Sequence, residues 1–137
     1  MAVVAIRRIL LIVNPASRRG RNALPRALKA FHAAGVSCTV LETRASGDAA
    51  AIARDSAPDF DAVFTIGGDG TAMEVLHAML GRPQPVGILP GGTGNLVSRA
   101  LGIPRRMGPA VRALLRGEVR TVDLAQMPDG RVFAFAA

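Results

Sequence analysis

A short apolar strand that leads through a glycine-rich loop directly into a helix most constrains how this chain folds. Residues 63–66 read Val-Phe-Thr-Ile, residues 67–71 read Gly-Gly-Asp-Gly-Thr, and apolar residues at helical spacing follow. Glycine permits a tight turn and leaves no Cβ in the way of a ligand. The first N–H groups of a helix attract an anion. The loop therefore predicts a phosphate site, in which Asp69 would hold Mg²⁺ or accept a proton from an attacking hydroxyl.

The same loop also fits a purely structural turn. It contains no G-x-x-x-x-G-K-[ST] phosphate motif, and residues 68–73 lack the last small residue of the dinucleotide-binding fingerprint. In the structural interpretation Thr71 is the N-cap of the helix and Glu74 completes a capping box. That box leaves Asp69 unexplained, and the two interpretations can hold together.

Two further polar loops follow apolar strands. Residues 9–13 (Ile-Leu-Leu-Ile-Val) precede the loop 14–20, and residues 86–90 precede the loop 91–95 (Gly-Gly-Thr-Gly-Asn). Continuous apolar runs are typical of central strands in a parallel sheet. Ligands of open parallel sheets sit beyond the carboxyl ends of the strands. We therefore expect the three loops to converge on one crevice.

Strand and helix patterns alternate along the chain, which predicts an α/β fold with a parallel sheet in one domain. Helix starts are marked by Asn22 and by Ser46, which we expect to be N-caps. The expected strands are 6–13, 36–42, 61–66, 86–89, 119–125 and 131–135, with a turn at 128–130; the expected helices are 22–34, 47–56, 71–81, 94–101 and 108–116.

Composition excludes several classes of site. The chain has one cysteine and two histidines among 137 residues, too few for a zinc cluster. Cys38 lies in an apolar strand, and we expect a buried, inert thiol. The net charge of +7 rests on sixteen arginines and one lysine. With no aromatic stacking platform and no reader motif, nucleic acid is not an expected partner.

The arginines gather in two places, which are Arg18, Arg19 and Arg21 beside the first loop and a second cluster within residues 105–120. The first could face phosphate and the second could touch lipid headgroups, although both patterns also fit solvated surface. No apolar run approaches the roughly 18 residues of a membrane span. The start of the chain has the wrong order for a signal peptide. We expect a cytoplasmic protein with at most peripheral contact at the inner membrane surface.

Four motifs in order resemble one family. They are Asn14-Pro15 with Ser17 and Gly20, the segment 42–49, the loop 67–71 with Glu74-Val75, and Pro90-x-Gly-Thr-x-Asn95. Together they are similar to the diacylglycerol kinase catalytic domain, a group that includes bacterial lipid kinases and sphingosine kinases and is more distantly similar to NAD kinases and phosphofructokinases. The resemblance covers about residues 6 to 137.

The resemblance implies an ATP-dependent lipid kinase with ATP and Mg²⁺ as cofactors. Its first domain would be a Rossmann-like three-layer α/β sandwich with a mostly parallel sheet, here residues 1–137. A β-rich second domain would follow, beyond this chain. The 137 residues alone would then be inactive, and the strand 132–135 would leave an edge through which copies of the chain could associate.

Carried over by position, the resemblance assigns Asp69 as the catalytic residue, with contact to the magnesium of bound ATP. Arg18 stands where the family usually has glycine, and Met73 where many relatives have asparagine, so the nucleotide affinity stays open. The residues that would line the nucleotide are Asn14, Pro15, Ser17, Thr43, Gly67, Gly68, Gly70, Thr71, Gly92, Thr93 and Asn95.

Two alternatives remain open at the level of sequence. An NAD kinase-like enzyme shares the Gly-Gly-Asp-Gly loop, although the loops at 14–15 and 90–95 fit lipid kinases better. A non-catalytic nucleotide-sensing module would have kept the loops without the second domain. The acceptor molecule separates the first alternative from a lipid kinase, and the absence of further coding sequence would favour the second.

Overall fold

A computed structural model describes residues 5–16, 20–91, 96–117, 123–126 and 132–135. Four residues of the expected nucleotide site lie outside these ranges. They are Ser17, Gly92, Thr93 and Asn95.

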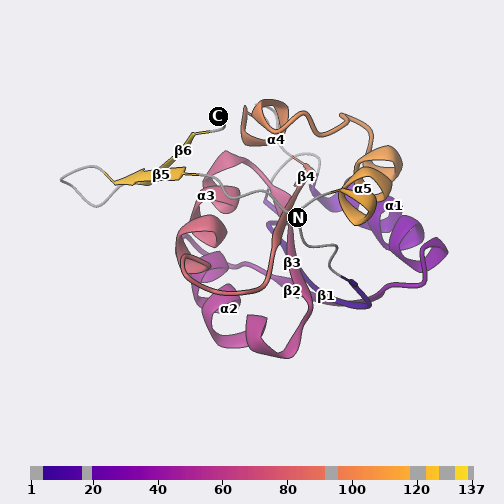
Figure 1. The fold of residues 1–137 in the computed structure, drawn as a ribbon, viewed down its shortest axis with the longest axis horizontal. Helices are drawn as coiled ribbons and strands as arrows, with labels where there is room; N and C mark the ends of the chain where they lie inside the picture. Colours follow the sequence, from indigo (N-terminus) through magenta and orange to yellow (C-terminus); the bar gives the residue numbers. More distant parts are fainter. Residues whose placement is uncertain (1–4, 17–19, 92–95, 118–122, 127–131, 136–137) are drawn as a thin grey trace.

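Four parallel strands form the central sheet in the order β2-β1-β3-β4 (Figure 1). Their bounds are β1 Arg8–Val13, β2 Ser37–Glu42, β3 Ala62–Gly67 and β4 Val86–Pro90. Strand β1 is central and its last five residues are buried, because helices cover both faces of the sheet. The expected parallel α/β sheet is confirmed.

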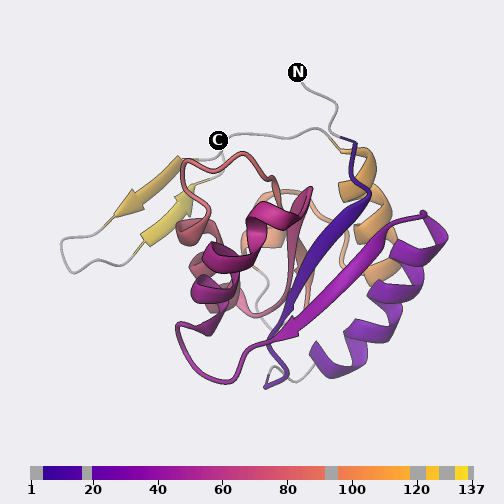
Figure 2. The same cartoon turned by 90° about the horizontal axis from the view of Figure 1, so that it is seen from below.

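Helices cover both faces of this sheet, so the molecule has three layers (Figure 2). Helices α1 (Gly20–Ala33) and α5 (Met107–Arg116) lie on one face. Helices α2 (Asp48–Ser56) and α3 (Asp69–Ala78) lie on the other, with a short 3-10 turn, η1 (Ala57–Asp59), after α2. Helix α4 (Leu96–Ala100) follows β4. The Rossmann-like three-layer sandwich is confirmed.

Each face of the sheet has its own apolar core, because successive side chains of a strand point to opposite sides. Ile9 and Leu11 of β1 belong to the core beneath α1 and α5, whereas Leu10 and Ile12 belong to the core beneath α2 and α3. In the first core the rings of Phe31 and Phe64 meet edge to face, with centroids 5.0 Å apart. The two layers are therefore built on alternate residues of the same strands.

Cys38 on β2 is half-buried rather than fully buried. Burial raises the pKa of its thiol from 9.0 to about 11. Since the thiolate is the reactive form, this side chain is a poor nucleophile at neutral pH, in agreement with the expected inert thiol.

Strands β5 (Asp123–Gln126) and β6 (Val132–Phe135) form a separate antiparallel pair. In Figure 1 this hairpin lies beside α3. The sequence predicted the two strands, with the first beginning four residues earlier at 119, in a stretch that lies outside the described residues. Asp123 pairs with Phe135 and Gln126 with Val132.

Two of the expected helix caps are wrong. Helix α1 begins at Gly20, so Asn22 lies inside it. At α2 the N-cap is Gly47, with φ of 92°, and not Ser46. The carboxylate of Asp48 instead accepts the N–H groups of Arg44 and Ala45 at 2.7 and 3.0 Å. The left-handed backbone conformation at residue 47 suits glycine, and the side chain of Asp48, which follows it, closes the turn.

Within the ranges described, no helix combines the length and apolar character needed to cross a membrane. The expected location in the cell stays a prediction.

Candidate functional site

The carboxyl ends of the four strands meet at one edge of the sheet. The N–H of Asn14, just after β1, donates to the carbonyl of Ile66 on β3 at 2.9 Å. The N–H of Thr43, just after β2, donates to the carbonyl of Val13 at 2.9 Å. Gly67 pairs with Pro90 across β3 and β4. As expected, the loops begin side by side at this edge. We call it the cradle, formed by Asn14, Thr43, residues 67–71 and Gly91.

The side chain of Asn14 links the first loop to helix α3. Its Nδ2 donates to the Oγ1 of Thr71 at 3.3 Å, and its Oδ1 accepts the N–H of Ala16 at 3.0 Å. Asn14 and Thr71 are 57 residues apart in the chain. Both belong to the expected nucleotide site, and the structure brings them into contact.

The carboxylate of Asp69 reaches across the cradle to helix α4. One oxygen accepts the N–H of Leu96 and the other accepts the N–H of Val97, each at 3.1 Å. These bonds fix the start of α4 against the start of α3. Each oxygen keeps a second lone pair, which can still accept a proton or bind a cation. Sequence spacing gave no sign of this contact, because the partners are 27 and 28 residues away.

Packing requires glycine at two positions of the cradle. A Cβ at Gly67 would lie 2.9 Å from Thr71 Oγ1 and 3.2 Å from Asn14 Cβ. A Cβ at Gly91 would lie 2.6 Å from Ile66 Cγ2. All three distances are shorter than an ordinary van der Waals contact, so any side chain would displace its neighbours.

Packing does not require glycine at Gly68 or Gly70. No heavy atom lies within 4 Å of a Cβ built at either position. Gly68 has a φ of −80°, which any residue adopts, and Gly70 lies in α3 without a positive φ. Side chains at both positions would point into open space at the start of α3. Two glycines that the fold does not need suit a ligand that approaches the backbone closely, as a phosphate does at a helix start.

The expected capping box at Thr71 and Glu74 is wrong. The N-cap of α3 is Gly68, which makes no side-chain cap hydrogen bond, and Thr71 lies within the helix. The hydroxyl of Thr71 meets Asn14 instead. Glu74 Oε1 accepts the N–H of Ala50 on α2 at 3.4 Å. Both side chains are used in tertiary contacts between elements, so neither closes the first turn of its own helix.

The other expected site residues divide into two groups. Thr43 is buried at the cradle floor and Pro15 is half-buried beside Asn14. Ser17, Gly92, Thr93 and Asn95 lie outside the described residues, as does Arg18. Among the residues that the structure describes, no three histidine, cysteine or acidic side chains gather to hold a metal ion.

The sequence profile of the diacylglycerol kinase catalytic domain matches residues 8–127 of this chain. A diacylglycerol kinase from Bacillus subtilis (strain 168) is 34% identical over 134 residues, which cover 93% of this chain and 44% of that protein. A diacylglycerol kinase from Staphylococcus saprophyticus is 32% identical over 126 residues, or 88% of this chain and 41% of that protein.

The fold is also similar to a solved structure. The crystal structure of a diacylglycerol kinase from Bacillus anthracis str. Sterne superposes with a TM-score of 0.80 at 32% identity, covering 93% of this chain and 48% of that one. The chain thus spans about half the length of the relatives that it matches. On the strength of the profile match and the cradle geometry, the chain belongs to the diacylglycerol kinase catalytic domain family.

Proposed function

We propose that this chain is the nucleotide-binding part of a kinase that transfers the γ-phosphate of ATP to the hydroxyl of a diacylglycerol-like lipid. Membership of the family supports the reaction class, and relatives such as that of B. subtilis are named diacylglycerol kinases. The observation that carries the proposal is the pair Gly68 and Gly70, whose missing side chains leave clear space at the start of α3.

The residues present fit ATP with a bound Mg²⁺. A phosphate would approach the backbone at Gly68 and Gly70, since no side chain covers it there. Asn14 and Thr71 place an amide and a hydroxyl at the same edge. Bound ATP would supply the phosphoryl group, with Mg²⁺ neutralising its charge. Asp69, held by the α4 backbone, would contact that cation or accept the proton of the lipid hydroxyl.

Titration calorimetry with ATP and Mg²⁺ tests the nucleotide half of the proposal. Gly68→Val should fold normally, because its φ suits valine and its Cβ meets nothing within 4 Å. The isopropyl group should occupy the space that a phosphate needs and weaken binding strongly. The control is Ala34→Val, which introduces the same isopropyl side chain at an exposed residue after α1, at the opposite end of the sheet. This variant should leave binding unchanged. Equal affinity of a folded Gly68→Val protein and the original chain would refute this site.

A further inference from the structure

Acidic residues occur in only two stretches of the chain, 42–74 and 118–129. The intervening and preceding stretches, 1–41 and 75–117, contain no aspartate or glutamate. These stretches supply α1 and α5, which lie together on one face of the sheet. The α2 and α3 layer, by contrast, lies within residues 42–78 and carries acidic groups such as Asp48, Asp55 and Glu74. The two helix layers therefore differ in charge, and the α1–α5 layer is purely basic.

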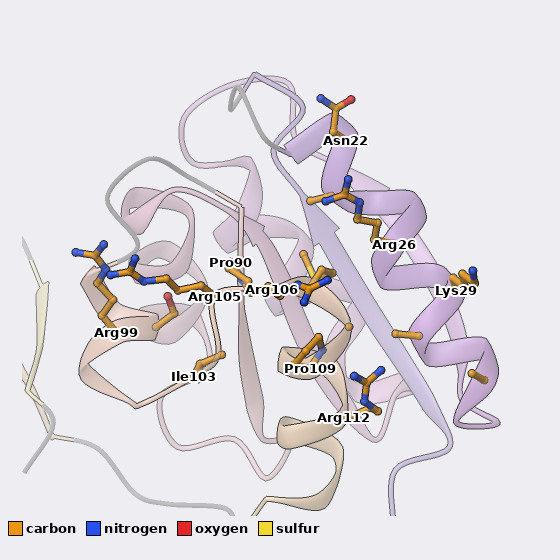
Figure 3. Close-up of a pocket in the computed structure, with 16 residues that line it drawn as sticks. Asn22, Arg26, Lys29, Pro90, Arg99, Ile103, Arg105, Arg106, Pro109 and Arg112 are labelled. Carbon is orange, nitrogen blue, oxygen red and sulfur yellow. The ribbon is translucent and has the colours of Figure 1, made fainter.

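A groove of about 1010 Å³ runs between α1 and α5 on this basic face (Figure 3). Its other walls come from the end of β4 and from residues 98–106. No acidic side chain lines it. Six cationic side chains do, namely Arg26, Lys29, Arg99, Arg105, Arg106 and Arg112.

The six cationic side chains come from α1, α4, α5 and the loop between α4 and α5. The groove therefore differs from a row of charges along one exposed helix. Figure 3 shows Arg26 and Lys29 on α1 across from Arg106 and Arg112. Gly108 leaves room for Arg112, whose Nη1 lies 3.3 Å from where a Cβ of residue 108 would be. The guanidinium of Arg112 therefore lies beside the first turn of α5.

The N-terminus of α5, where the helix dipole is positive, borders the same groove. Met107 and Gly108, which begin this ten-residue helix, both line it. The first turn contains no acidic residue, and the N-cap Arg106 makes no side-chain cap hydrogen bond. Guanidinium groups and a helix N-terminus raise the electrostatic potential together. An anion in the groove would neutralise charges that otherwise repel one another.

The groove is separate from the cradle. None of the described cradle residues lines it, and its walls come from α1, α5, α4 and the end of β4. We propose that the groove binds a phosphate-bearing anion, either a soluble phosphate compound or the headgroup of an anionic phospholipid. Arginine suits this chemistry because its planar fork donates two parallel hydrogen bonds to phosphate oxygens. Nucleic acid fits less well, because no aromatic side chain lines the groove to stack on bases.

Nuclear magnetic resonance titration with inorganic pyrophosphate tests the site directly. Amide signals of Met107 and Gly108 should shift, independently of any shift at the cradle. Arg106→Gln combined with Arg112→Gln should weaken this binding about tenfold, as expected for the loss of two exposed charge contacts. A control with Arg7→Gln and Arg54→Gln removes the same net charge from exposed residues outside the groove and should have little effect.

Sedimentation with vesicles identifies the source of the phosphate. Binding to phosphatidylglycerol vesicles and not to phosphatidylcholine vesicles, lost in the Arg106/Arg112 variant, would assign the groove to lipid headgroups. Pyrophosphate binding without vesicle binding would assign it to a soluble phosphate compound.

Other outcomes overturn the proposal. They are pyrophosphate shifts confined to the cradle, equal weakening in both double variants, or binding of a single-stranded oligonucleotide alone. A failure of ATP to bind at the cradle would leave the signals of Met107 and Gly108 unaffected, so the two proposals are tested separately.

Discussion

The glycines of the cradle fall into two kinds. Gly67 and Gly91 are packed against neighbouring atoms, whereas Gly68 and Gly70 face open space. A substitution at the first kind should damage the fold, whereas one at the second kind should leave the fold intact and weaken ligand binding. The same residue type thus reports on stability at one position and on binding at the next.

Gly70→Ala should change stability and nucleotide binding in opposite directions. Glycine within a helix costs roughly 0.5–1 kcal/mol relative to alanine, so the variant should melt at a higher temperature. Its new methyl group faces the cradle, so ATP affinity should fall. Gly67→Ala is the contrast, since its Cβ would crowd Thr71 and Asn14, and it should lose about 1–3 kcal/mol of stability. Thermal denaturation and calorimetry measure both effects, and a Gly70→Ala protein that gains affinity would contradict the assignment.

Asp69→Asn should loosen the start of α4. An asparagine keeps one oxygen acceptor but turns an NH₂ group toward the other backbone N–H, so one of two bonds to Leu96 and Val97 is lost. Hydrogen bonds to a charged partner contribute about 1.5–3 kcal/mol, and amide exchange at these two residues should accelerate. Glu74→Gln, which bonds to α2 instead, should leave that exchange unchanged. In a complete kinase, Asp69→Asn should also lower turnover by about 10²–10⁴ if the carboxylate is the base. Unchanged exchange at Leu96 and Val97 would contradict the contact.

At the scale of elements, one carboxylate joins the beginnings of two strands. Asp61 precedes β3, and its Oδ2 accepts the N–H groups of Arg7 and Arg8 at 3.0 and 2.9 Å. These backbone hydrogen bonds lower the pKa of Asp61 below its ordinary value of 3.8, helped by the charges of Arg8 and Arg7. The exposed side chain thus aligns β1 with β3 at the end of the sheet opposite the cradle.

This contact should make stability depend on pH in the acid range. A folded-state pKa below the unfolded value means that the contribution is fully present above pH 3.8 and is lost as the pH falls through the folded pKa. Asp61→Asn should therefore show a smaller fall in melting temperature below pH 3.8 than the original chain. Asp59→Asn, at a neighbouring exposed carboxylate in η1, is the matched control. Identical pH profiles of the Asp61 variant and the original chain would exclude the effect.

At the scale of the whole molecule, the cradle is the edge of one α/β sandwich. Phosphoryl transfer needs the acceptor hydroxyl aligned with the γ-phosphate and shielded from water. The relatives are about twice as long as this chain, which leaves room in them for a pocket that holds the acyl chains.

The 137-residue chain should therefore not phosphorylate a lipid alone. A labelled-ATP assay with diacylglycerol in mixed micelles should detect no turnover, whereas a longer relative such as the B. subtilis diacylglycerol kinase serves as the positive control. NAD replaces diacylglycerol in a parallel assay, because phosphorylation of NAD would favour the NAD kinase-like alternative. Lipid turnover by the chain at a rate near that of the control would contradict the prediction.

Strand β6 should promote self-association at high concentration. Its pairing in the described part of the chain is with β5, and an unpaired strand edge is a template for a second copy. Ala134→Lys places a charge on this strand and should reduce the association seen by sedimentation velocity. Ala34→Lys adds the same charge at an exposed site after α1 and should not. A chain that stays monomeric across the concentration series would contradict the prediction.

The sequence alone determined the architecture and the place of the site. Apolar runs that alternate with helical patterns predicted a parallel α/β sheet, and carboxyl ends of parallel strands meet at one edge by geometry. The contact between Asn14 and Thr71 follows from that convergence. Local sequence failed at helix starts, where it assigned caps to Asn22, Ser46 and Thr71. Helix α1 begins before Asn22, and glycines at 47 and 68 are the N-caps of α2 and α3. The hydroxyl of Thr71 bonds to Asn14 instead.

Only the tertiary structure decided which distant groups meet. Asp69 bonds to α4 at a separation of 27 and 28 residues, and Glu74 bonds to α2 at 24. The basic groove joins Arg26 on α1 to Arg112 on α5, more than half the chain apart. Local spacing carries no information about such pairs, because their distances depend on how two helices pack against the same face of a sheet.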